Sequence, residues 1–287
     1  MRTSLPYSEH TPWSEPGRFA ELVSTWPLDP AGLSEAIAER LVHIRSDEGK
    51  GHVDQDCLRQ DLPLRSAPEL LAASKECRRD GGPSKVGAVC RDFALLAVSA
   101  FRSRGFPARL RVGFADYFTK GFFEDHWLCE WRDGDRWRRL DVEVAAGAAP
   151  SRIPFDPTDV AHDRFGTAAE TWATTRRRPE DAERYGVSAL DLAGRWFIAG
   201  SVYRDAAALS CVEVKPWDYW GLGLSLAIDR VKVGVEVERD VDKLSSILER
   251  SDVDNVSSSL PPVQEWMPEK TVNDWSQGTP RIVTLRS

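Results

Sequence analysis

Apolar residues near the start of the chain follow the spacing of an amphipathic helix. They recur every three to four positions over 31–44, at Leu33, Ile37, Leu41 and Ile44. This spacing predicts a helix with one apolar face that packs onto a core. The next stretch, 45–64, is polar and contains two glycines, which is typical of a loop.

Two further helices are predicted in the first hundred residues. The second begins at 66–69, where a proline follows Ser66 and Ala67 and suits the first turn of a helix. A cluster of helix breakers occupies 78–83, and the apolar spacing after it predicts a third helix over 89–104. Gly105 is the expected stop signal of this third helix.

The pattern then changes to that of strands. Three strand-like segments follow one another near 107–115, 122–132 and 136–144. A helix followed by consecutive antiparallel strands predicts an α+β core in which the helix packs on the sheet.

The ends of the chain are less regular, and we expect three parts. Residues 1–30 are rich in proline and form an irregular N-terminal arm, held by Trp13, Phe19 and Trp26. Residues 31–160 form the core. Residues 161–287 form a mostly helical C-terminal extension packed on the core.

Within the extension, 187–211 and 242–250 have helical spacing. The valines of 231–237 alternate with polar residues and glycine, which is the period of a strand. The last 35 residues contain several prolines and a run of serines, and predict a wrapping tail with little regular structure.

Composition and charge limit the possible functions. The chain has 287 residues, a net charge of −7 and a pI near 5.4, which argues against a nucleic-acid binder with a basic surface. No run reaches the ~18 apolar residues of a membrane helix, and the first residues lack the apolar stretch of a signal peptide. We therefore expect a cytoplasmic protein that binds neither nucleic acid nor membrane. The oligomeric state is left open.

The cysteines favour a reducing environment and give no sign of a metal site. There are five, an odd and sparse set without a CxxC pair: Cys57, Cys77, Cys90, Cys129 and Cys211. A loose group of His, Asp and Cys residues over 43–57 fits no standard metal site, so a metal hydrolase is a distant alternative. No calcium-loop pattern is present. We expect no metal and no cofactor.

One cysteine is placed as a nucleophile would be. Cys90 lies between the breaker cluster and the predicted third helix, in or next to the first turn. Unpaired backbone N–H groups and the positive end of the helix dipole at that point favour a thiolate, and the same N–H groups can hold an oxyanion. Taken alone, a cysteine in such a position is more often a small buried apolar residue.

The predicted hairpin supplies a histidine and an acid. Asp133-Gly134 is a preferred pair for a two-residue type I′ turn. Counting outward from that turn, His126 faces Asp141, which would fix the imidazole tautomer and leave the other nitrogen as a base. A turn at Gly134-Asp135 would instead place Glu143 opposite His126. Glu143 is therefore the competing orienting carboxylate.

In combination these segments resemble a known family. The segments 87–94 (GAVCRDFA) and 102–109 (RSRGFPAR) look like the nucleophile helix and following strand of transglutaminase-like proteins. The segments 125–131 (DHWLCEW) and 137–141 (WRRLD) look like that family's histidine and aspartate strands. The resemblance covers about 85–145, and a segment from 196 to 220 resembles C-terminal parts of uncharacterised bacterial members.

The resemblance implies a transglutaminase-like version of the papain-like fold, with Cys90 as nucleophile, His126 as base and Asp141 as orienting acid. It implies a cysteine acyltransferase or amidohydrolase that forms a thioester from an amide or ester of a peptide or small molecule, with water or an amine as acceptor. Val142-Glu143 stands where the family commonly has Pro-Thr, which leaves the substrate pocket unassigned. The alternative is a catalytically inactive binding protein of the same fold.

Overall fold

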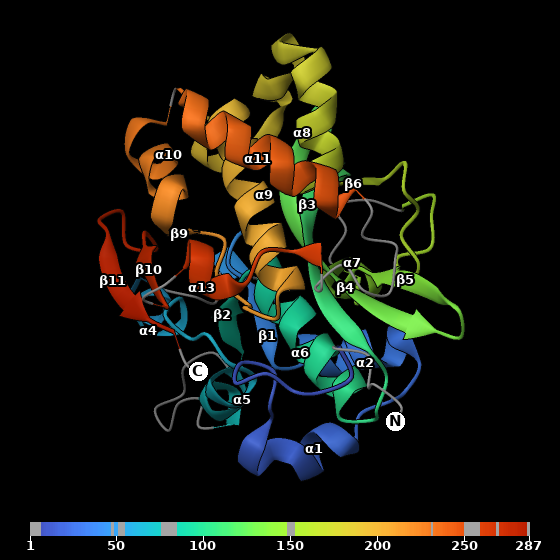
Figure 1. The fold of residues 1–287 in the computed structure, drawn as a ribbon. Coiled ribbons are helices and arrows are strands. Elements are labelled where there is room, and N and C mark those ends of the chain that lie inside the picture. The colour runs from blue at the N-terminus through green and yellow to red at the C-terminus, as the bar shows by residue number, and fades with distance from the viewer. Residues whose placement is uncertain are drawn as a thin grey trace. The chain divides into compact units, whose positions relative to one another are not determined.

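The computed structural model describes residues 7–46, 49–50, 55–75, 85–147, 153–230, 232–249, 259–267 and 270–285 (Figure 1). The chain divides into two compact units. The first consists of Met1–Leu110 with Leu128–Val160, and the second of Arg111–Trp127 with Ala161–Ser287. The three-part organisation expected from the sequence stays a prediction.

The fold is α+β, as predicted. The helices of the first unit are short apart from the central one: α1 (Ala20–Ser24), α2 (Pro30–Ala38), α4 (Gln55–Asp61), α5 (Ala67–Lys75), α6 (Cys90–Arg102) and α7 (Val142–Ala145). Trp13, Phe19 and Trp26 of the N-terminal arm are buried, as expected. The arm also contains α1, a helix that the proline-rich sequence did not indicate.

The helix predicted over 31–44 is shorter than its apolar spacing suggests. Asp29 caps its start by accepting from the Gly32 N–H at 2.7 Å, and α2 ends at Ala38. The next apolar residues belong to strand β1 (Leu41–His43), which pairs in parallel with β2 (Val86–Ala88). Tertiary pairing overrides a local pattern here.

The region that precedes the central helix is also more regular than predicted. The stretch 45–64, expected to be a loop, contains α4. The second predicted helix is confirmed as α5. The breaker cluster 78–83 lies outside the described residues.

Helix α6 is the centre of the first unit. All of its residues from Cys90 to Arg102 are buried, and it packs against α1, α2, α5, α7 and β2. Gly105 adopts a φ of +76°, the left-handed conformation that favours glycine after a helix. The start and stop signals of the sequence thus predicted this helix to within two residues at each end.

The hairpin is formed by β4 (Phe122–Asp133) and β5 (Arg136–Leu140), which follow β3 (Ala108–Thr119). In its register Asp133 pairs with Arg136 and Cys129 with Leu140. The turn is therefore Gly134-Asp135, and the predicted Asp133-Gly134 turn is wrong. Gly134 has a φ of +62° and is the only residue of the pair with a positive φ, the pattern of a type II′ turn that takes glycine first.

The third predicted strand, 136–144, ends early. Strand β5 stops at Leu140, and the chain turns directly into the short helix α7. Asp141 caps that helix, and Glu143 lies within it. Neither acid is therefore part of the described ladder between β4 and β5.

In the second unit, the strands β6 (Phe165–Thr167), β7 (Tyr185–Val187) and β8 (Leu192–Ala193) extend the sheet, whose strand order is β6-β3-β4-β7-β8 with β5 also on β4. β6 pairs antiparallel with β3, where Gly113 faces Thr167. A Cβ at Gly113 would lie 2.2 Å from the Gly166 carbonyl oxygen, so this close pairing requires glycine.

The helices of the second unit are α8 (Ala168–Arg177), α9 (Arg195–Leu209), α10 (Leu224–Asp229), α11 (Val235–Leu248) and α13 (Val263–Trp266). Helix α9 packs against α8 and α11 (Figure 1). The helix predicted over 187–211 begins only at Arg195, after β8, and the helix predicted over 242–250 is the C-terminal part of α11. No described helix has both the length and the apolar character needed to cross a membrane.

Two predictions for the extension are wrong. The valine alternation over 231–237 does not form a strand, because α11 begins at Val235. Its buried face, which includes Val237, Val241, Leu244 and Leu248, has helical spacing that becomes visible only in a longer window. The C-terminal tail contains β10 (Thr271–Asp274) and β11 (Arg281–Thr284), which form an antiparallel sheet with β9 (Asp218–Tyr219).

Candidate active site

Cys90 is the first residue of α6, where the sequence placed it. Val89 before it is extended, with φ −119° and ψ 166°, so the chain changes from strand to helix between these two residues. The Asp92 carboxylate accepts from the Val89 N–H at 3.2 Å and fixes this change of direction. Cys90 is 7 % exposed and is followed by the backbone N–H groups that a helix start leaves without intrahelical partners.

A second acid holds the strand that leads to the cysteine. The buried Asp61 carboxylate, at the end of α4, accepts from the Gly87 N–H at 2.8 Å. On the helix side, the buried Arg91 guanidinium donates to Asp92 at 3.1 Å. No local pattern indicates Asp61, because its partner lies 26 residues away and its own segment is predicted to be a loop.

The two candidate acids have different tasks in α7. Asp141 is buried, and its Oδ1 accepts from the Val144 N–H at 3.1 Å as the cap of the helix. Its backbone N–H donates to the Pro157 carbonyl at 2.9 Å. Glu143 is 6 % exposed, and one of its carboxylate oxygens lies within 4.8 Å of Cys90 Sγ. The structure therefore brings the competing acid next to the candidate nucleophile.

His126 lies on β4, in the part of the strand that belongs to the second unit. It is buried, and its ring makes edge contacts with Phe118 and Tyr117, at 4.8 Å and 6.2 Å between ring centroids. These rings limit the orientations open to the imidazole. Cys90 and Asp141 belong to the first unit, and the assembly of the three residues as a triad stays a prediction.

Cys129 shows what a purely structural thiol looks like in this chain. It is fully buried in β4, and burial raises the pKa of its thiol far above the usual range; Arg102 opposes the shift and Glu130 adds to it. Cys57 and Cys211 are partly exposed, and Cys77 lies outside the described residues. Cys129 therefore provides an unreactive internal reference for Cys90.

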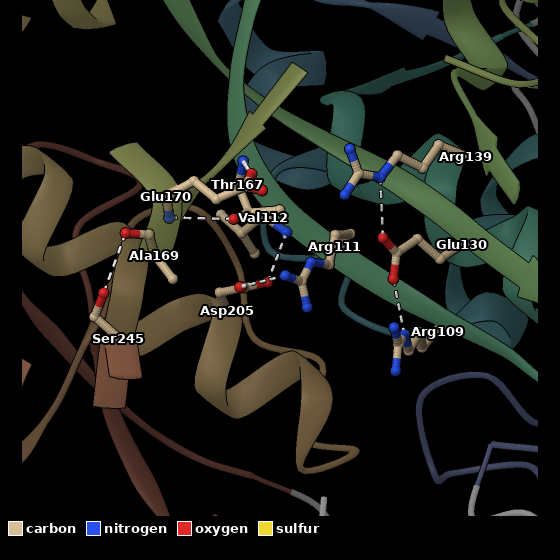
Figure 2. Close-up of polar contacts among 10 residues, drawn as sticks. All are labelled: Arg109, Arg111, Val112, Glu130, Arg139, Thr167, Ala169, Glu170, Asp205 and Ser245. Carbon is tan, nitrogen blue, oxygen red and sulfur yellow. Dashed lines mark hydrogen bonds and ion pairs between the residues drawn. The ribbon is translucent and has the colours of Figure 1, made fainter. Parts of the chain in front are cut away.

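Buried ion pairs hold strands in place within each unit, and Figure 2 shows these pairs. In the first unit, Glu130 accepts from Arg109 at 2.8 Å and from Arg139 at 3.2 Å. In the second unit, Asp205 accepts from the Val112 N–H at 2.9 Å and pairs with Arg111 at 3.7 Å. These contacts tie β3, β4, β5 and α9 down within their own units, and single-residue patterns did not indicate them.

The suggested metal-binding group over 43–57 is only partly described. His43 is in β1, and its Nδ1 accepts from the Arg45 N–H at 3.2 Å. Cys57 is in α4, while His52 and Asp54 lie outside the described residues. Nothing in the described part of this segment favours the metal-hydrolase alternative.

The structure is that of an α+β protein. Its buried central helix begins with a cysteine and is followed in the chain by an antiparallel hairpin. Residues 74–142 match the model of the transglutaminase-like superfamily. The match contains Cys90, His126 and Asp141 and ends one residue before Glu143. It supports a cysteine-dependent enzyme in general terms.

One solved structure is similar to part of the chain. It is a protein from Cytophaga hutchinsonii described as a candidate cysteine protease, with 18 % identity and a TM-score of 0.34. The likeness covers 52 % of this chain and 44 % of that protein, so less than half of its length is represented here. No match was found among curated proteins.

Proposed function

We propose that this protein is a cysteine-dependent acyl-transfer enzyme that forms a thioester on Cys90. The observation that carries the proposal is the position of Cys90 as the first residue of a buried helix inside the transglutaminase-like segment. A thiol at a helix N-terminus is favoured as thiolate. The substrate class is an amide or ester of a peptide or small molecule.

His126 takes the proton from Cys90 and the thiolate attacks the substrate carbonyl carbon. The negative oxygen of the tetrahedral intermediate is held by backbone N–H groups at the start of α6, that of Cys90 among them. The intermediate collapses, the C–N or C–O bond breaks, and the leaving group receives the proton from His126. Water or an amine then loses a proton as it attacks the thioester carbon, the C–S bond breaks, and the sulfur recovers its electron pair.

Asp141 is proposed to orient the imidazole. Its position is fixed by the Oδ1 bond to the Val144 N–H, which gives the carboxylate a defined direction. Phe118 and Tyr117 restrict the ring from the side of β3 within the second unit. A carboxylate on one nitrogen leaves the other nitrogen available as the base.

The test is the rate of alkylation by iodoacetamide between pH 5 and 9, resolved by residue with mass spectrometry. We expect Cys90 to label rapidly at pH 6 in the wild type and more slowly in His126→Ala, because removing the imidazolium removes the partner of the thiolate. Cys129 is the internal reference and should stay unlabelled in the folded protein, since it is fully buried.

Cys57 and Cys211 report the behaviour of partly exposed thiols in the same sample. If Cys90 labels only near pH ~8.5, as an ordinary thiol does, and ignores the loss of His126, the proposed thiolate–imidazolium pair is wrong. That result would favour a non-catalytic binding protein of the same fold.

A further inference from the structure

We propose that Glu143 is a catalytic base for the second half of the reaction, in which it activates the acceptor that attacks the thioester on Cys90. The inference rests on the proposed function of Cys90. It assigns separate roles to two acids that lie two residues apart: Asp141 to the first step and Glu143 to the second.

The distance to the sulfur supports this role. A Glu143 carboxylate oxygen lies within 4.8 Å of Cys90 Sγ. In the acyl-enzyme the carbonyl carbon is one covalent bond from Sγ. A water or amine held by the carboxylate at a hydrogen-bond distance of ~2.8 Å is therefore within reach of that carbon.

The surroundings keep Glu143 in place. It lies on α7, which packs against both α6 and α2. The helix is fixed by the Asp141 cap and by the backbone bond from the Ala145 N–H to the Asp141 carbonyl at 2.9 Å. At 6 % exposure the carboxylate faces little bulk water.

Asp141 is less suited to this task. One of its oxygens accepts from the Val144 N–H, so the carboxylate is turned toward its own helix. The cap holds the turn on which Glu143 stands. Asp141 is thus a positioning residue for Glu143 as well as the proposed partner of the imidazole.

The step is balanced. The acceptor, water or a neutral amine, gives one proton to the Glu143 carboxylate as its oxygen or nitrogen forms a bond to the thioester carbon. The C–S bond breaks and its electron pair returns to Cys90. The proton on Glu143 returns through solvent to the Cys90–His126 pair, which restores the carboxylate and the protonation state of the resting enzyme.

The experiment uses the full chain with p-nitrophenyl acetate as the probe. The initial burst of p-nitrophenolate measures acetylation of Cys90, and the following steady rate measures loss of the acetyl group. Glu143→Gln should keep the burst rate within about 2-fold and lower the steady rate about 100-fold, the range of a lost general base. Acetyl-Cys90 should accumulate in the mass spectrum. Glu35→Gln, an exposed residue of α2, is the matched control, and Cys90→Ser gives the background.

Two further measurements separate catalysis from structure. Hydroxylamine attacks thioesters without a base, so it should return the steady rate of Glu143→Gln to within about 3-fold of the wild type treated alike. Glu143→Asp keeps a carboxylate and should give an intermediate rate. A merely structural defect would not be rescued by hydroxylamine.

Three outcomes count against the inference. A burst and a steady rate that fall together would make Glu143 the orienting acid of the triad. A steady rate equal to that of the control would show that Glu143 takes no part. If the wild type forms no acetyl-Cys90, the proposed function itself fails, which the first two outcomes do not imply.

Discussion

Two cysteines of the first unit are both buried, and their surroundings differ completely. Cys90 opens α6 beside helix N–H groups, with a carboxylate oxygen within 4.8 Å of its sulfur. Cys129 is in the middle of β4, paired with Leu140, and its pKa is raised by burial. The comparison shows that low exposure says little about the chemistry of a thiol.

What separates the two thiols is the polar groups placed around them. Around Cys90 the acids Asp61 and Asp92 hold backbone N–H groups and so define the direction of the chain. Next to Cys129, Glu130 is occupied by two arginines and stabilises the hairpin. Asp61 and Asp92 fix the backbone just before Cys90, whereas Glu130 holds strands together.

The largest expected effect comes from replacing each of the two cysteines by alanine in turn. Cys90→Ala should lower acetylation by p-nitrophenyl acetate at least ~1000-fold, because the nucleophile itself is lost. Cys129→Ala should leave acetylation within about 2-fold, since its thiol stays protonated in the fold. Stopped-flow release of p-nitrophenolate measures both. Equal acetylation rates in the two variants would show that Cys90 and Cys129 do not differ as nucleophiles.

The next largest effect concerns the buried ion pairs of Glu130, the residue next to Cys129 in β4. Glu130→Gln removes a carboxylate that pairs with both Arg109 and Arg139, so two buried guanidinium groups lose a shared counter-charge. We expect the free energy of unfolding to fall by about 3 kcal/mol, the cost of breaking a buried pair. Urea denaturation followed by circular dichroism checks this. Glu35→Gln is the exposed control, and a loss below about 1 kcal/mol would contradict the prediction.

A smaller loss of stability is expected when the strand that precedes Cys90, β2, loses its hydrogen bond to Asp61. Asp61→Ala leaves the Gly87 N–H of β2 without its acceptor, which should cost about 1 to 3 kcal/mol in the free energy of unfolding. Asp61→Asn keeps an acceptor oxygen and should recover most of the loss. Iodoacetamide labelling at pH 6 gives the second readout: Asp61→Ala should slow labelling of Cys90 and leave Cys129 unlabelled. Unchanged labelling of Cys90 would mean that Asp61 does not help to position it.

The sequence predicted the Cys90 side of this comparison far better than the hairpin side. Helix α6 is specified by local signals, and the match over 74–142 confirms the resemblance that those residues suggested. The hairpin register depends on a choice between two adjacent turns that share Gly134. Sequence rules favoured a type I′ turn, and the structure has the pattern of type II′. Moving the turn by one residue changes the acid that the extrapolated register places opposite His126 from Asp141 to Glu143.

Other elements depended on contacts that a local pattern does not contain. Leu41 continues the apolar spacing of α2, yet it belongs to β1 because β2 pairs with it. Asp61 and Gly87 meet across 26 positions. Val235 and Val237 fit a strand over seven residues and a helix over fourteen. Long-range pairing decides the first two cases and the length of the sequence window the third. One sequence gives no direct measure of long-range pairing.

The smallest expected effect is a pH dependence of stability that belongs to Cys129 alone. Its folded pKa is raised by burial above the ordinary value of 9.0. Below that value the thiol is protonated in both states and adds its full contribution to stability. Above it the unfolded thiol releases its proton while the folded thiol keeps it, so the free energy of unfolding falls by up to ~1.4 kcal/mol per pH unit.

Urea denaturation of the wild type and Cys129→Ala at pH 8, 9 and 10 measures this contribution, with every sample kept reduced. The difference in unfolding free energy between the two proteins should change between pH 9 and 10 by about 1 kcal/mol, with the wild type losing more. Other groups that titrate in this range cancel in the difference, including Tyr203, whose pKa is raised by burial and by its bond to Asp240. A difference that stays constant from pH 8 to 10 would mean that Cys129 ionises as readily in the folded chain as in the unfolded one. Burial would then not be what separates it from Cys90.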